Sequence, residues 1–205
     1  MLAYLISAYC DPDHVKRLIE SLDVDADFYV HIDARVDDGP FRRLLPDKVH
    51  FVERHPVSWG GYEQVEYQME LLRAAVESGQ PYSHVVCLSG QDYPLWSNRR
   101  IHDFFAQHPH GEFIGGYDLT RTDNKDQLCK ITHYHPFRDL QWKNLWLKNK
   151  LIVVSRHVLS ILGFRRKPQV RINGMLRDVY FGSDYWAITL DCARYVLRTM
   201  KQNPN

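Results

Sequence analysis

Short apolar runs alternate with amphipathic segments through the first half of the chain. Residues 2–9 form a continuous apolar run of strand length, and the Asp11-Pro12 pair that follows is typical of a helix start. Residues 15–22 carry apolar side chains at helical spacing, and residues 28–32 form a second apolar run. Strand, helix and strand in this order predict a βαβ unit, whose parallel strands place ligands at their carboxyl ends.

The alternation continues to the end of the chain with one interruption. Residues 117–150 are polar and aromatic, and they predict an irregular or partly helical insertion. We predict further strands over residues 49–52, 84–88, 112–114 and 184–190, and further helices over residues 98–105, 151–164 and 191–200 and around Val65, Met69, Leu72 and Val76. The pattern therefore predicts an α/β, Rossmann-like fold with a mostly parallel sheet flanked by helices.

Composition narrows the class of protein. The chain has 205 residues, which favours a single domain, and its 44% hydrophobic and 25% charged content is that of a soluble globular protein. The net charge of +1 gives no global field for nucleic acid, so we expect no nucleic-acid partner. No apolar run is long enough to cross a membrane, and the N-terminal run has no basic flank. We expect a cytoplasmic location, with peripheral attachment to a membrane left open, and four free cysteines.

Several strong motifs are absent from the sequence. There is no G-x-G-x-x-G after the first strand, no P-loop and no H-E-x-x-H, and Cys87 occupies the first glycine position of a G-x-S-x-G elbow around Ser89. These absences disfavour dinucleotide enzymes, P-loop NTPases, zincins and serine hydrolases.

No convincing metal site is found either. The doublets His31-x-Asp33 and His133-x-His135 supply two ligands each, which is too few for a site. Asp23-x-Asp25-x-Asp27 precedes its strand, where a metal ligand would follow it, so we expect a solvated turn. We expect residues 165–167, a run of two arginines and a lysine, to be solvated surface, with a pyrophosphate contact as the alternative.

Polar clusters remain at the positions where an α/β sheet binds ligands. They are Asp33, Ser58-Trp59-Gly60-Gly61, residues 89–92 and residues 182–186. A carboxylate after the second strand suits a ribose or a base edge, because it accepts two hydrogen bonds from adjacent groups. Each cluster alone also has a plain structural interpretation, such as a helix cap or a turn.

Together, however, the segments LAYLISAY, FYVHIDARV, VSWGGYEQVEYQMELLRAA, HVVCLSGQDYPL and GSDYWAITLDCARYVL resemble the core-2/I-branching β-1,6-N-acetylglucosaminyltransferase family, which includes peptide O-xylosyltransferases. The resemblance covers residues 2 to about 198. It implies a GT-A-like fold and an inverting, metal-independent transfer of N-acetylglucosamine or xylose from a UDP-sugar to a glycan or glycoprotein, with no cofactor beyond that donor.

Carried over by position, the resemblance also assigns residues to subsites. Ala8, Tyr9 and Asp33 would meet the uridine part of the donor, and Ser58 and Trp59 would lie beside the nucleotide. Further along, Ser89, Gln91 and Asp92 would lie near the donor sugar, whereas Ser183, Asp184, Tyr185 and Trp186 would help form the acceptor side. Apart from the resemblance, we expect the insertion over residues 117–150 to shape the acceptor side, although its residues match no chemical motif.

The sequence departs from the family at its end. The family's catalytic base is usually a Glu in a P-D-E-like segment, and its diphosphate-binding Arg and Lys follow later, but none of these segments occurs before Asn205. We therefore expect residues 1–205 to be one GT-A-like domain without its C-terminal catalytic segment. One alternative makes Asp184 or Asp92 the base. Another is a catalytically inactive module that binds a UDP-sugar or a glycan.

Overall fold

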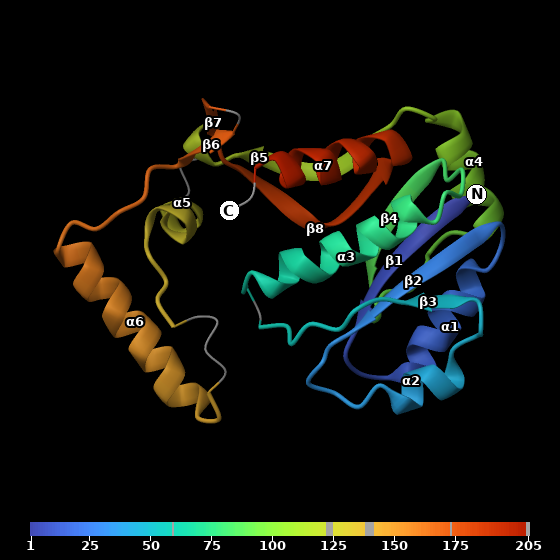
Figure 1. Ribbon diagram of the computed structural model, residues 1–205, viewed down its shortest axis with the longest axis horizontal. Helices are drawn as coiled ribbons and strands as arrows, with labels where there is room; N and C mark the ends of the chain where they lie inside the picture. Colours follow the sequence, from blue (N-terminus) through green and yellow to red (C-terminus); the bar gives the residue numbers. More distant parts are fainter. Residues whose placement is uncertain (59, 122–124, 138–141, 173, 204–205) are drawn as a thin grey trace. The chain divides into compact units, whose positions relative to one another are not determined.

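The structure is a computed structural model that describes residues 1–58, 60–121, 125–137, 142–172 and 174–203 (Figure 1). The chain divides into two compact units. The first comprises Met1–Val57, Glu63–Gly115 and Asp184–Pro204, and the second comprises Ser58–Tyr62 and Gly116–Ser183. The expectation of a single domain stays a prediction.

The first unit is built on the predicted βαβ start. Its strands are β1 (Leu2–Ala8), β2 (Ala26–Ile32), β3 (Val49–Phe51), β4 (His84–Ser89), and parts of β5 (Phe113–Asp118) and β8 (Tyr180–Thr189). Its helices are α1 (Pro12–Leu22), α2 (Gly39–Leu44), α3 (Glu63–Glu77), α4 (Asn98–Gln107) and α7 (Leu190–Gln202). Asp11 begins α1 as expected, because its side chain accepts the His14 N–H at 2.9 Å.

These strands form one six-stranded sheet in the order β3-β2-β1-β4-β8-β5 (Figure 1). β1 pairs in parallel with both β2 and β4, and β2 pairs in parallel with β3. β8 runs antiparallel to β4, with Cys87 opposite Trp186. The predicted mixed α/β fold with a mostly parallel sheet is confirmed, and the carboxyl ends of β1, β2 and β4 lie at one edge.

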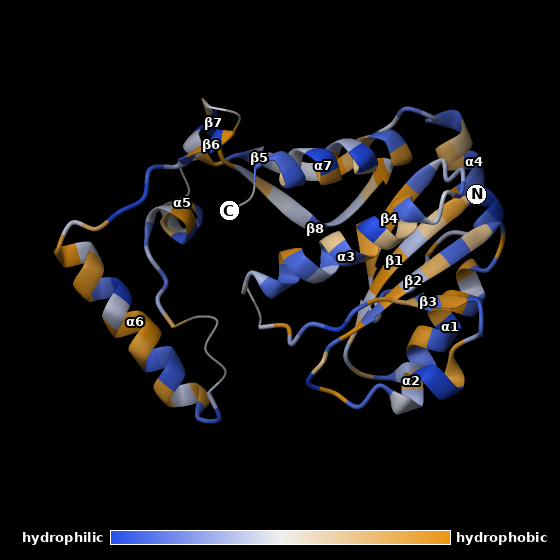
Figure 2. Cartoon of the chain, viewed as in Figure 1, coloured by the Kyte–Doolittle hydropathy of each residue, from blue (hydrophilic) through white to orange (hydrophobic). Residues whose placement is uncertain are grey.

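Alternate residues of β1 enter two separate cores. On one face, Tyr4 and Ile6 pack with α1, α2 and α4, and the Tyr4 ring stacks on Phe28 at 5.5 Å between centroids. On the other face, Ala3 and Leu5 pack with α3 and α7. α1 turns its apolar stripe to the sheet and its charged residues to solvent, a division that Figure 2 shows by colour. Helices on both faces explain why the strands read as continuous apolar runs.

The second unit contains the predicted insertion. It holds a short 3₁₀ turn (Leu119–Arg121), α5 (Lys125–Thr132), α6 (Leu145–Ile161) and a hairpin of β6 (Gln169–Ile172) and β7 (Met175–Asp178). The predicted partly helical insertion is confirmed. The helix expected over residues 151–164 begins six residues earlier, where the Asn144 side chain caps it by accepting the Leu147 N–H at 3.1 Å. No helix among the described residues is long and apolar enough to cross a membrane.

Both ends of β8 also differ from the expectation, each for a local reason. β8 begins at Tyr180, four residues before the predicted start. Within the second unit, Gly116 lies so close to the Phe181 carbonyl that a Cβ on it would be 2.5 Å from that oxygen, so only glycine allows the approach. At the other end, Thr189 closes the strand because its side chain caps α7 by accepting the Cys192 N–H.

Candidate active site

Backbone hydrogen bonds bring the ends of three strands together. The Asp33 N–H donates to the Ala8 carbonyl at 3.0 Å, and the Gly90 N–H donates to the Ser7 carbonyl at 2.7 Å. A Cβ on Gly90 would lie 2.7 Å from the Ala8 Cβ, so this approach requires glycine. The predicted site residues that follow β1, β2 and β4 therefore share one edge of the sheet, and Tyr9 beside them is half exposed.

Asp33 is buried at the end of β2 and is bonded to Arg35. The Arg35 backbone N–H and Nε lie 2.9 and 3.0 Å from Oδ1, and its Nη2 lies 2.6 Å from Oδ2. Burial alone would raise the pKa of Asp33, but these bonds and the Val57 N–H together lower the pKa below its usual value. The carboxylate therefore stays charged and fixes a guanidinium whose side chain is half exposed.

Arg35 was not singled out by the sequence analysis. The signal that could have found it is the D-x-R spacing directly after a strand, where a loop can fold an arginine back onto the carboxylate. A fixed guanidinium at this edge can bind a base, a hydroxyl or a phosphate.

His31, two residues before Asp33, has a structural role. Its Nε2 accepts the His55 N–H at 2.9 Å, and its ring stacks on Tyr67 of α3 at 4.7 Å. Burial, supported by the charges of His55 and Arg54, lowers the pKa of His31 to about 4 against the opposing effect of Asp33. Both members of the His31-x-Asp33 doublet thus have protein partners, and the described residues contain no group of three or more metal-ligating side chains.

The Ser89–Asp92 segment is a closed turn. The Asp92 Oδ2 accepts the Ser89 N–H at 2.7 Å, and the Asp92 N–H returns a bond to the Ser89 carbonyl at 3.0 Å. The Gln91 N–H lies 3.3 Å from the Ser89 Oγ, and His14 of α1 contacts the Asp92 carbonyl at 3.0 Å. The turn fixes the Asp92 carboxylate beside the end of β4.

Asp92 and Asp184 both act on the environment of Tyr185. The charge of Asp92 raises the pKa of the Tyr185 hydroxyl, with smaller contributions from burial and from Asp184. Burial, with the charges of Asp184 and Asp92, likewise raises the pKa of the Cys87 thiol to about 12. The two carboxylates proposed as alternative bases come from neighbouring parts of the sheet, because Asp184 lies in β8, which pairs with β4, and Asp92 follows the end of β4.

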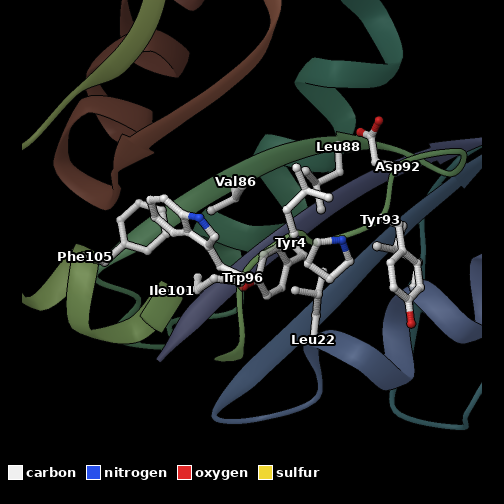
Figure 3. A pocket seen from close by; sticks show the side chains of 12 residues that line it. Tyr4, Leu22, Val86, Leu88, Asp92, Tyr93, Trp96, Ile101 and Phe105 are labelled. Carbon is white, nitrogen blue, oxygen red and sulfur yellow. The ribbon is translucent and has the colours of Figure 1, made fainter. Parts of the chain in front are cut away.

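An apolar pocket of about 430 Å³ lies next to Asp92 on the α1 and α4 face of the sheet (Figure 3). Val86, Leu88 and the Trp96 ring line it, and Asp92 contributes to its lining (Figure 3). The Tyr4 hydroxyl, at the buried base of the pocket, has no hydrogen-bond partner among the described residues, and burial raises its pKa. The pocket can accept an apolar surface beside a carboxylate.

The predicted turn of Asp23, Asp25 and Asp27 lies at the opposite end of β2 from Asp33. Asp27 accepts the Tyr82 hydroxyl at 2.6 Å, and Asp23 pairs with Lys48. The first two aspartates are exposed, which confirms the solvated turn.

A family model, described as "Branch: Core-2/I-Branching enzyme", matches residues 2–204. The chain belongs to the Core-2/I-branching enzyme family. The resemblance read from the sequence is thereby confirmed.

Similarity to curated Core-2/I-branching proteins is low in identity but long in extent. The chain is 26% identical over 204 residues to the Homo sapiens N-acetyllactosaminide β-1,6-N-acetylglucosaminyl-transferase, covering 96% of this chain and 46% of that protein. It is 24% identical over 119 residues to the Drosophila melanogaster xylosyltransferase oxt, covering 55% of this chain and 12% of that protein. The chain thus spans less than half the length of these relatives.

Some residues of the segments that resemble the Core-2/I-branching family lie in the second unit. Ser58 and Ser183 belong to the second unit, and Ser58 is buried there, where its carbonyl accepts the Gly61 N–H at 2.9 Å. Trp59 lies outside the described residues. The roles assigned to these three residues stay predictions. Trp186 lies in β8 of the first unit, opposite Cys87.

Proposed function

We propose that this chain is the donor-binding domain of an inverting glycosyltransferase that transfers N-acetylglucosamine or xylose from a UDP-sugar to a glycan or glycoprotein hydroxyl, without a metal. The observation that supports it most is the meeting of the Asp33–Arg35 pair and the Ser89–Asp92 turn at one edge of the parallel strands, in a chain of the Core-2/I-branching family. The two donor sugars are those in the names of the relatives.

In this proposal the donor lies across the carboxyl ends of β1, β2 and β4. Asp33 is negatively charged and bonded to Arg35, so the pair presents N–H donors and carboxylate oxygens to the uridine part of the donor. Ala8 and Tyr9 line the same edge. The sugar lies toward Asp92, with the apolar pocket of Figure 3 beside it.

The transfer needs one proton to be removed from the acceptor hydroxyl. As its oxygen attacks the anomeric carbon from the face opposite UDP, the bond from that carbon to the diphosphate breaks and UDP leaves with the electron pair. Within this chain Asp92 and Asp184 are the alternative candidates for the base, because Asp184 lies in β8, which pairs with β4, and Asp92 closes the turn that follows β4. The products are UDP, the glycosylated acceptor and a proton on the base.

A catalytically inactive module that binds a UDP-sugar or glycan is the second candidate. One observation favours it: the Asp92 carboxylate already accepts the Ser89 N–H inside its own turn. This bond occupies one of the two oxygens that would have to take the proton.

Transfer of labelled sugar from UDP-N-acetylglucosamine and UDP-xylose to a panel of glycan acceptors separates these candidates. We expect the unmodified chain to bind UDP. Transfer of sugar by this chain would assign the base to Asp184 or Asp92, and D184N or D92N, whichever removes the base, should then lower the rate about 100-fold or more. The other variant serves as the matched control. A folded chain that binds UDP but transfers neither sugar supports the inactive module, and a folded chain that does neither contradicts both proposals.

Metal independence has a separate test by calorimetry with UDP. We expect the dissociation constant in excess EDTA to agree with that in manganese within about twofold, because the Asp33 carboxylate is already paired with Arg35 and the described residues contain no group of three or more metal-ligating side chains. Binding that appears only with manganese would contradict the metal-independent mechanism.

A further inference from the structure

The second unit carries half of the Lys and Arg residues of the chain but few of its acidic residues. Residues 116–183 contain thirteen Lys and Arg against five Asp and no Glu, an excess of eight positive charges, although the whole chain carries a net +1. The remainder of the chain is therefore net negative. A charge excess confined to one unit produces a local field that the overall net charge hides.

Five of these cations surround one pocket. The pocket has a volume of about 1260 Å³ and lies wholly within the second unit. We call it the basic pocket. The cations that line it are Lys130, Arg156, Arg165, Arg166 and Lys167. Tyr62 and Tyr134 also line it, and they offer aromatic faces of the kind that pack against sugar rings.

The cations of the basic pocket come from three elements that are tied together. The Arg166 N–H donates to the Thr132 carbonyl at the end of α5 at 2.8 Å, and its guanidinium lies 4.4 Å from the centroid of the Tyr134 ring. Arg165 Nη2 lies 3.3 Å from the Oγ of Ser160 on α6. Residues 165–167 are exposed, which confirms the solvated surface run expected from the sequence, and they also line a pocket with Lys130 and Arg156.

Carboxylates do not neutralise these cations in the described part of the chain. Asp118 bonds to Thr120 and pairs with Arg121, and Asp178 accepts the Gln169 side-chain amide at 3.1 Å. No ion pair joins a described acid to any of the five cations of the basic pocket. Five cations around one pocket produce a positive local field, which favours an anionic ligand.

We propose that the basic pocket binds an acceptor glycan that carries several carboxylate or sulfate groups. The volume exceeds that of a pocket for one small molecule, the cations are distributed around it, and the tyrosines suit a carbohydrate. This inference rests on the proposed function, because an acceptor glycan presupposes a glycosyltransferase or a glycan-binding module. It adds the chemical class of acceptor, which a resemblance between sequences does not supply.

The test measures binding directly and needs no transfer. Oligogalacturonate and its methyl ester share one backbone and differ in charge, and dextran sulfate and dextran form the corresponding pair for sulfate. A single-stranded oligonucleotide serves as the competing polyanion. The pocket variant is R165Q/K167Q. Its matched control, K143Q/K150Q, removes the same charge from exposed positions of the second unit that do not line the pocket.

We expect at least one charged glycan to bind the unmodified chain while its neutral counterpart does not. R165Q/K167Q should weaken that binding at least tenfold and flatten its salt dependence, and K143Q/K150Q should change it less than twofold. Equal losses in both variants, binding of the neutral glycans, or tighter pocket-dependent binding of the oligonucleotide would overturn the proposal. So would loss of UDP affinity in R165Q/K167Q, which would assign the basic pocket to the donor diphosphate. Absence of sugar transfer alone would count against the proposed function and leave this binding result standing.

Discussion

UDP should bind the D33A variant roughly 10 to 100 times more weakly than the unmodified chain, the range expected when a buried, charged hydrogen-bonding partner is lost. The carboxylate of Asp33 holds the Arg35 guanidinium through three side-chain contacts at 2.6 to 3.2 Å. Its removal both deletes the acceptor and releases the guanidinium. Titration calorimetry with UDP measures the change.

The variant D23A provides the matched control. Asp23 also pairs with a cation, Lys48, but it lies at the opposite end of β2 from Asp33. We expect D23A to leave UDP affinity within about twofold, because it removes an exposed ion pair far from the proposed donor edge. A folded D33A chain with unchanged UDP affinity would remove Asp33 from the site, and equal losses in the two variants would show a general electrostatic effect.

The strands that are covered by helices on both faces of the sheet could be predicted from the sequence. β1, β2 and β4 appear as continuous apolar runs because helices cover both faces of the sheet. α2 was missed because it is six residues long and buries only Phe41, which leaves no periodicity to detect. The β6–β7 hairpin was missed for a related reason: each strand has four residues, so the polar and apolar alternation of β6 is too short to be distinctive, and β7 has none.

Only the site residues that follow a predicted strand could be located from the sequence. Asp33 and Asp92 follow apolar runs, so sequence alone placed them at the ligand-binding edge. The sequence did not reveal that Asp92 closes its own turn or that Asp33 is bonded to Arg35, since both depend on loop conformation. The interaction of Asp92 and Asp184 with one tyrosine depends on the antiparallel register of β8 against β4, which hydrophobic patterns do not specify.

The free energy of unfolding should fall by about 3 kcal/mol between pH 6.5 and pH 4 because of His31 alone. His31 is 1% exposed, and its pKa is lowered from 6.5 to about 4 in the folded state. Above pH 6.5 the ring is neutral in both states and contributes no pH dependence. As the pH falls, the unfolded chain takes up the proton first, so stability declines until the folded state also binds it near pH 4. Urea unfolding followed by circular dichroism at several pH values measures the loss.

The variant H31Q isolates this contribution, because a glutamine oxygen can still accept the His55 N–H but cannot titrate. Its free energy of unfolding is expected to be lower at pH 7 and to decline less steeply, so the gap to the unmodified chain narrows by about 2 kcal/mol on going to pH 5. H110Q, which removes an exposed imidazole of the same unit, controls for the loss of a histidine. Parallel pH profiles for H31Q and the unmodified chain would mean that the buried ring takes up its proton without unfolding. The stacking of His31 between Tyr67 and His55 argues against that outcome, since a charged ring there would lie next to Arg54 and away from water.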